Sequence, residues 1–97
     1  MPHKIIWSAK ARFDLREIIE FIARDQPGAA RRFGKALVKT VESLALHPQL
    51  GRLLPERPEI YREIVQRPYR IIYRAESGAR AITVVRIWHG ARGEPQL

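Results

Sequence analysis

The segment from Arg62 to Arg74 constrains the fold more than any other part of the chain. It reads REIVQRPYRIIYR, with branched and aromatic residues in two runs that Gln66, Arg67 and Pro68 separate. Such side chains suit a pleated, half-buried surface, and a proline, which has no amide hydrogen, belongs at a turn or at the start of a strand. The segment therefore predicts two antiparallel strands joined by a tight turn.

The second strand of this hairpin has two chemically different faces. Because side chains alternate along a strand, Tyr69, Ile71 and Tyr73 share one face. Arg70 and Arg74 lie on the other. If the tyrosines pack inward, the arginine face is either a solvated side of the sheet or a binding surface, and the pattern leaves both interpretations open.

A short apolar strand at 4–7 and two amphipathic helices are predicted before this hairpin. Ser8 suits a helix N-cap, and apolar residues at helical spacing follow it as far as about Arg24. Pro27 suits the first position of a second helix, which Pro48 ends. Gly34 inside that helix predicts close approach to the first, so we expect an antiparallel helical hairpin with a very short link.

The rest of the chain completes a small sheet. A proline-rich connection is expected at 47–58, a last strand at 82–88, and a polar tail at 89–97 that frays. The order strand, helix, helix, strand, strand, strand predicts one two-layer α+β domain over residues 1–97. The helical hairpin would cover one face of an antiparallel sheet and leave the other face open and rich in arginine.

Composition narrows the possible partners. Eighteen Lys and Arg against ten Asp and Glu give a formal net charge of +8. Such a field attracts nucleic acid, an acidic protein or a membrane surface, although arginine also accumulates through genomic composition alone. The chain has no cysteine, which excludes disulfides and thiolate metal sites. No apolar run approaches the roughly 18 residues of a membrane span, so we expect a cytoplasmic protein.

The residue pattern predicts neither a metal site nor a cofactor. The three histidines, His3, His47 and His89, are scattered, and no carboxylates have ligand spacing. There is also no phosphate-binding glycine loop and no nucleophile elbow.

Metal-free RNA cleavage is one chemistry that the residues permit. It needs a base, an acid and cations around the phosphorane. His89 is the candidate acid and Glu63 the candidate base, although Glu63 should face away from Arg62, its neighbour in the strand. A histidine at a strand end is equally a surface or capping residue. The candidate cations, which are also the candidate partner-binding residues, are Arg62, Arg70, Arg74, Arg86 and Arg92.

Nucleic-acid binding without catalysis is a second possibility, because aromatic side chains stack on bases. Aromatic residues of a small domain also build its core, which is the competing interpretation. The aromatic candidates are Trp7, Tyr61, Tyr69, Tyr73 and Trp88.

Ordered motifs along nearly the whole chain resemble the RelE/ParE toxin superfamily. They are Asp14-Leu15-xx-Ile18-xx-Phe21-Ile22-Ala23, Pro27-x-Ala29-Ala30-xx-Phe33, Leu44-xxx-Pro48-xx-Gly51-Arg52, Arg62-Glu63, Tyr69-Arg70-Ile71-Ile72-Tyr73-Arg74 and His89-Gly90-Ala91-Arg92. The resemblance implies the two-layer fold already derived. It also implies a type II toxin that a cognate acidic antitoxin neutralises in a hetero-oligomer, and the net positive charge suits such a partner.

The superfamily divides by target, and the residues favour one branch. RelE-like members cut mRNA on the ribosome, whereas ParE-like members poison DNA gyrase. The resemblance places Arg62, Arg70 and Arg92 at three basic positions of the nucleases, and His89 would complete the ribonuclease set. However, Ile64 stands where a second basic residue is expected, and no tyrosine follows Arg92. We therefore expect a ParE-like gyrase poison without catalytic residues. The alternatives are a RelE-like mRNA endonuclease and a nucleic-acid-binding or antitoxin-titrating module without toxicity.

Overall fold

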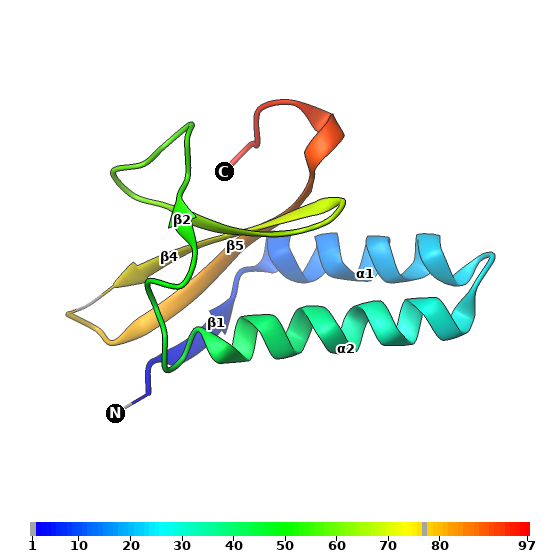
Figure 1. Ribbon diagram of the computed structural model, residues 1–97, viewed down its shortest axis with the longest axis horizontal. Helices are drawn as coiled ribbons and strands as arrows, with labels where there is room; N and C mark the ends of the chain where they lie inside the picture. The colour runs from blue at the N-terminus through cyan, green and yellow to red at the C-terminus, as the bar shows by residue number, and fades with distance from the viewer. Residues whose placement is uncertain (1, 77) are drawn as a thin grey trace.

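The computed structural model describes residues 2–76 and 78–97, and it shows a helical hairpin packed on one face of a sheet (Figure 1). The two-layer α+β fold predicted from the sequence is confirmed. The elements are β1 (Lys4–Trp7), α1 (Ala9–Ala23), α2 (Pro27–Ser43), β2 (Arg52–Leu53), β3 (Arg62–Gln66), β4 (Tyr69–Glu76), β5 (Ala81–His89) and the 3-10 helix η1 (Gly90–Arg92).

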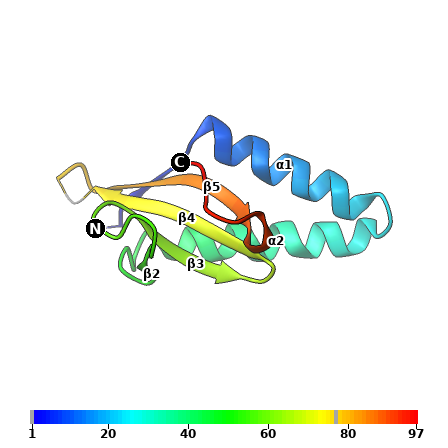
Figure 2. The ribbon, with the colours of Figure 1, turned by 90° about the horizontal axis from the view of Figure 1, so that it is seen from above.

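The sheet has the strand order β1-β5-β4-β3-β2. Figure 2 shows the neighbouring strands β5, β4, β3 and β2. Strands β3, β4 and β5 form the predicted antiparallel meander. Two features go beyond the prediction. Strand β1 pairs in parallel with β5, so that the sheet is mixed, and the two-residue strand β2 pairs with β3 inside the segment expected to be a plain connection.

Two of the predicted helix features, the N-cap at Ser8 and the close approach at Gly34, are present, whereas α2 ends at Ser43, before Pro48 is reached. The Oγ of Ser8 accepts a hydrogen bond of 3.0 Å from the backbone N–H of Ala11, which caps α1. The same hydroxyl donates to the carbonyl of Val85 at 3.0 Å and so ties the start of α1 to β5. A Cβ at Gly34 would lie 2.9 Å from Cδ1 of Ile19, so the glycine permits the close approach of α2 to α1.

The tyrosine face of β4 packs toward the helices. Leu37 and Val41 of α2 are fully buried in the same cluster as Ile71. The ring of Tyr69 meets Phe33 edge to face, with 5.4 Å between centroids. This arrangement resolves the ambiguity that the sequence left about which face meets the core.

The opposite face of the sheet is not the open surface predicted. Leu54, Ile72 and Trp88 form a buried cluster there, and Leu97 packs against it. The indole N–H of Trp88 donates to the carbonyl of Gly93 at 3.1 Å, which holds the tail back over the strand. The prediction of a fraying tail was therefore wrong, because this face carries apolar side chains that the tail covers.

Candidate functional site

Arg70 lies in a closed ion network on the face of the sheet away from the helices. Its Nε donates to Glu63 at 2.6 Å, and its two terminal nitrogens donate to Glu56 at 3.1 and 2.7 Å. The side chain of Glu63 is fully buried and also meets Arg52 at 2.6 Å. The hydrogen bond from Arg70 lowers the pKa of Glu56, and the same bond raises the pKa of Arg70. All three guanidinium nitrogens of Arg70 are thus bound to carboxylates.

Arg62 lies on the other face of the sheet from Arg70. It pairs in register with Tyr73, whose ring packs toward α2, and its guanidinium donates to the carbonyl of Gly51 at 2.8 Å. As the alternation predicted, Glu63 faces away from Arg62. The candidate nuclease residues Arg62, Arg70 and Glu63 therefore do not converge on one point.

Arg86 is held by Asp14 of α1. Its Nε and one terminal nitrogen donate to the two carboxylate oxygens at 2.8 and 2.9 Å, and the backbone N–H of Ile87 donates to the same carboxylate at 3.0 Å. The hydrogen bond that Arg86 donates to Asp14 raises the pKa of Arg86. Sequence reasoning gave Asp14 no role of its own, although a carboxylate on the buried stripe between Ala11 and Ile18 was a usable signal.

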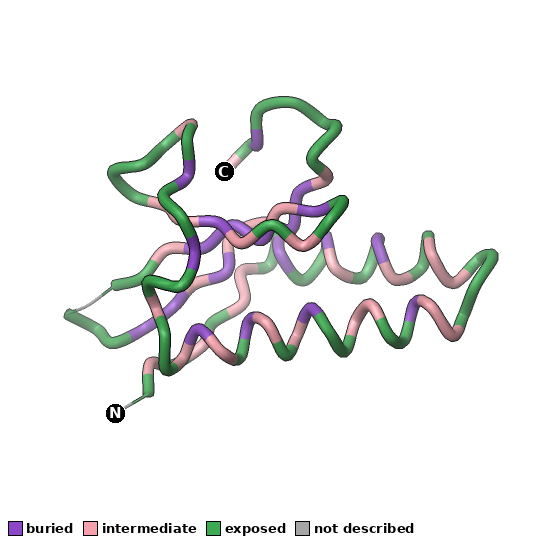
Figure 3. Tube along the Cα trace, in the orientation of Figure 1, coloured by how far each residue is buried: buried purple, intermediate pink, exposed green. Residues whose placement is uncertain are grey.

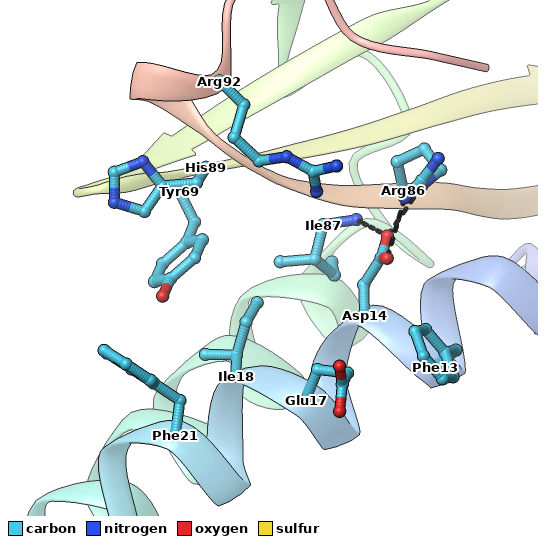
Figure 4. A pocket seen from close by; sticks show the side chains of 10 residues that line it. All are labelled: Phe13, Asp14, Glu17, Ile18, Phe21, Tyr69, Arg86, Ile87, His89 and Arg92. Carbon is cyan, nitrogen blue, oxygen red and sulfur yellow. Dashed lines mark hydrogen bonds and ion pairs between the residues drawn. The ribbon is translucent and has the colours of Figure 1, made fainter.

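A groove of about 430 Å³ runs between α1 and the end of β5 (Figure 4). Its α1 side carries two exposed aromatic side chains two turns apart, Phe13 and Phe21, which are 57% and 64% exposed. Glu17 lies between them on the same helix, and Arg92 and His89 line the opposite side. The groove therefore combines exposed apolar side chains with charged groups of both signs.

His89 and Arg92 are both held by contacts within the chain. The Nδ1 of His89 accepts a 3.0 Å hydrogen bond from the N–H of Ala91, so the histidine caps η1 as the alternative interpretation proposed. Its ring meets Tyr69 edge to face at 5.1 Å, and burial raises the pKa of that tyrosine. The guanidinium of Arg92 lies 4.0 Å from the centre of the Trp88 ring.

The predicted partner-binding arginines are thus distributed over the molecule. Arg86 and Arg92 line the groove, whereas Arg70 borders a neighbouring hollow that also includes His89. Arg74 pairs with Glu76 at 3.1 Å toward the far end of β4.

The aromatic side chains predicted to stack on bases are mostly in the core. Trp88, Tyr69 and Tyr73 are between 0% and 9% exposed, so none presents a ring face to a nucleotide. Tyr61 is partly buried and packs beside the Trp88 cluster. For these residues the competing interpretation as core is correct.

Residues 2–76 and 78–97 contain neither a metal site nor a membrane-spanning helix. No three His, Asp or Glu side chains in these ranges lie close enough to hold a metal ion. Neither described α-helix is both long enough and apolar enough to cross a membrane.

Comparison with known proteins finds relatives that are all described as toxins. Residues 5–93 match the family described as the ParE toxin of the type II toxin–antitoxin system parDE. Toxin RelE2 of Caulobacter vibrioides is 34% identical over 92% of this chain and 97% of its own. Toxin RelE1 of the same organism is 33% identical over 93% and 96%.

Two solved structures share the fold. A chain of the chromosomal ParDE toxin–antitoxin system from P. aeruginosa has a TM-score of 0.75 at 22% identity, over 90% of this chain and 95% of that one. The toxin–antitoxin complex RelBE2 of Mycobacterium tuberculosis has a TM-score of 0.70 at 21% identity, over 92% and 99%.

Proposed function

The chain belongs to the ParE toxin family of type II toxin–antitoxin systems, and from this premise we propose that it inhibits growth by poisoning DNA gyrase. A gyrase poison of this kind stabilises the cleaved DNA–enzyme intermediate by binding. It needs a complementary surface and no reactive group of its own.

The positions of Arg62 and Arg70 are the observation that favours gyrase over mRNA as the target. Cleavage of RNA requires cations and a proton-transfer pair around one phosphate. Arg62 and Arg70 lie on opposite faces of the sheet, and the guanidinium of Arg70 is occupied by Glu63 and Glu56. Binding an RNA phosphate at Arg70 would require breaking a largely buried ion network.

The alternative is a ribosome-dependent mRNA endonuclease. It is supported by two relatives that are named RelE toxins, at 34% and 33% identity. In that case His89 and Arg92, which border one groove, would be the residues nearest to the chemistry.

We further propose that the cognate antitoxin binds in the groove between α1 and β5. Exposed Phe13 and Phe21 offer apolar anchor points, and Arg92 at the border suits an acidic, amphipathic segment. Both solved structures compared above are toxin–antitoxin systems, which supports a protein partner of this type.

Gyrase supercoiling with purified, antitoxin-free protein tests the target. We expect loss of supercoiling together with linear cleaved plasmid on the same gel. Full gyrase activity in the presence of folded toxin would overturn the proposal. Cleavage of mRNA in a translating extract by the same preparation would then favour the nuclease, and its loss in His89→Ala would identify the acid.

The antitoxin site is tested by titrating the toxin with its antitoxin until gyrase activity returns. The double variant Phe13→Ala and Phe21→Ala should need about tenfold or more antitoxin, because truncating a central aromatic anchor typically costs about 2 kcal/mol or more. Leu46→Ala with Ile60→Ala removes two exposed apolar side chains elsewhere and is the matched control. Equal antitoxin demand for both double variants would exclude the groove.

A further inference from the structure

Helix α2 carries a row of cations along the side that faces solvent. Its four members, which we call the α2 stripe, are Arg31, Arg32, Lys35 and Lys39, and all are exposed. At 100° per residue they occupy about a third of the helix circumference, opposite the buried residues Leu37 and Val41. Figure 3 shows the same division, with buried positions of α2 toward the sheet and exposed positions on its outer side.

The charge of the α2 stripe is not neutralised by any residue that the structure describes. Across residues 2–76 and 78–97, none of its four side chains takes part in an ion pair or a side-chain hydrogen bond. The one acidic residue of α2 is Glu42, in the last turn of the helix. The stripe therefore presents four free cations over about 12 Å of helix, given a rise of 1.5 Å per residue.

The chemistry of the stripe suits phosphates better than a protein surface. Protein interfaces are built on buried apolar and aromatic anchors, and they are enriched in arginine but depleted in lysine. The α2 stripe has no exposed large apolar side chain, whereas the α1–β5 groove has Phe13 and Phe21. Contacts to a nucleic-acid backbone, by contrast, require only cations on flexible side chains and gain affinity from released counterions.

We propose that the α2 stripe binds the phosphate backbone of duplex DNA. The inference rests on the proposed function, because a gyrase poison acts on an enzyme that already holds duplex DNA. The stripe would contact that DNA and the groove would remain available to a protein. The toxin would then bind DNA weakly and without sequence preference, and its action on gyrase would weaken as salt rises.

A salt titration of binding tests this directly. Wild-type toxin is titrated into a labelled duplex DNA of about 20 base pairs, and the logarithm of the affinity is plotted against the logarithm of salt concentration, where each phosphate contact contributes a slope of about −0.9. Lys35→Gln with Lys39→Gln should make the slope less steep by about 2. Lys4→Gln with Lys10→Gln removes the same charge from exposed positions outside α2 and should leave the slope unchanged.

Gyrase assays with the same variants separate this inference from the proposed function. If the wild type poisons gyrase and the α2 double variant needs several-fold more protein, both are supported. If both double variants poison gyrase equally and bind DNA with equal slopes, the stripe is excluded while the proposed function stands. If the wild type leaves gyrase unaffected, the proposed function fails, and the slope comparison alone decides whether the stripe binds DNA. Tighter binding to a duplex RNA than to DNA at equal salt would also overturn the inference.

Discussion

The arginines of the sheet and the cations of α2 carry the same charge in two different environments. In the sheet, Arg70 and Arg86 each contact a largely buried carboxylate. On α2, Lys35 and Lys39 contact none of the described carboxylates. The formal charge of +8 is therefore unevenly available to a partner, and a count of cations from the sequence does not locate it.

Burial explains the difference. A guanidinium that lies against the sheet loses water and needs a carboxylate in good geometry to offset that loss. The side chains of Arg70 and Arg86 are only 15% and 13% exposed, and both have such a partner. The lysines of α2 remain solvated and need none. Removing the buried charges of the sheet should therefore lower the stability of the fold, whereas removing the lysine charges of α2 should weaken binding to a partner.

The largest expected effect is on folding, from Arg70→Met. The substitution leaves buried Glu63 with Arg52 as its remaining partner, and we expect the free energy of unfolding to fall by about 3 kcal/mol. Urea unfolding followed by circular dichroism measures the change.

Two controls accompany this variant. Adding Glu63→Leu to Arg70→Met should recover part of the lost stability, because it removes the uncompensated charge. Arg57→Met breaks an exposed ion pair with Glu59 and should cause no measurable change. Wild-type stability of Arg70→Met would show that the network contributes little to folding.

Asp14→Asn should destabilise somewhat less. The amide keeps the shape of the carboxylate but weakens the charge-assisted bonds from Arg86 and the N–H of Ile87, at a cost of about 2 kcal/mol. The same unfolding measurement reports it. Glu17→Gln, which neutralises an exposed carboxylate one turn further along the same helix, is the matched control and should unfold like the wild type.

Low pH should lower the stability of the fold by protonating Glu56, which pairs with Arg70. Its pKa in the folded protein lies below the reference value of 4.5, chiefly because Arg70 donates to it. The folded state thus binds this proton less readily than the unfolded chain does. The stability contributed by Glu56 is complete above about 4.5 and is lost as pH falls through the lower folded value. Glu56→Gln should therefore unfold with a shallower pH dependence below this point, whereas an unchanged profile would rule out the ion pair as the cause.

Sequence reasoning succeeded where structure depends on near neighbours. The N-cap at Ser8, the start of the second helix at Pro27 and the strand pair around Pro68 follow from local preferences, and all three are present. The close approach at Gly34 was also predictable, because a glycine inside a helix costs about 1 kcal/mol relative to alanine and tight packing against a neighbouring helix offsets that cost.

Sequence reasoning failed where the structure depends on contacts between distant parts of the chain. The short strand β2 exists because β3 supplies its partner, and the tail folds back because Trp88 and Ile72 leave an apolar surface to cover. The ionic partners of Arg70 and Arg86 lie 7, 14 and 72 residues away in the chain. Alternation along β4 predicted that Arg70 lies on the face opposite the tyrosines, but not the carboxylates that meet it there. Along β5 simple alternation fails, because the register shift opposite Ile72 and Tyr73 puts Ile87, and not Arg86, on the same face as Val84.

The smallest expected effect on folding comes from the α2 stripe, and it completes the comparison. Lys35→Gln with Lys39→Gln removes two solvated charges that contact no described carboxylate, so the free energy of unfolding should stay within about 0.5 kcal/mol of the wild type. Relief of repulsion between neighbouring cations would move it toward higher stability. Urea unfolding at low and high salt measures both effects, and any difference from the wild type should vanish at high salt. A loss of stability similar to that of Asp14→Asn would mean that the stripe supports the fold. An unchanged fold together with weaker DNA binding would assign these cations to a partner outside the chain.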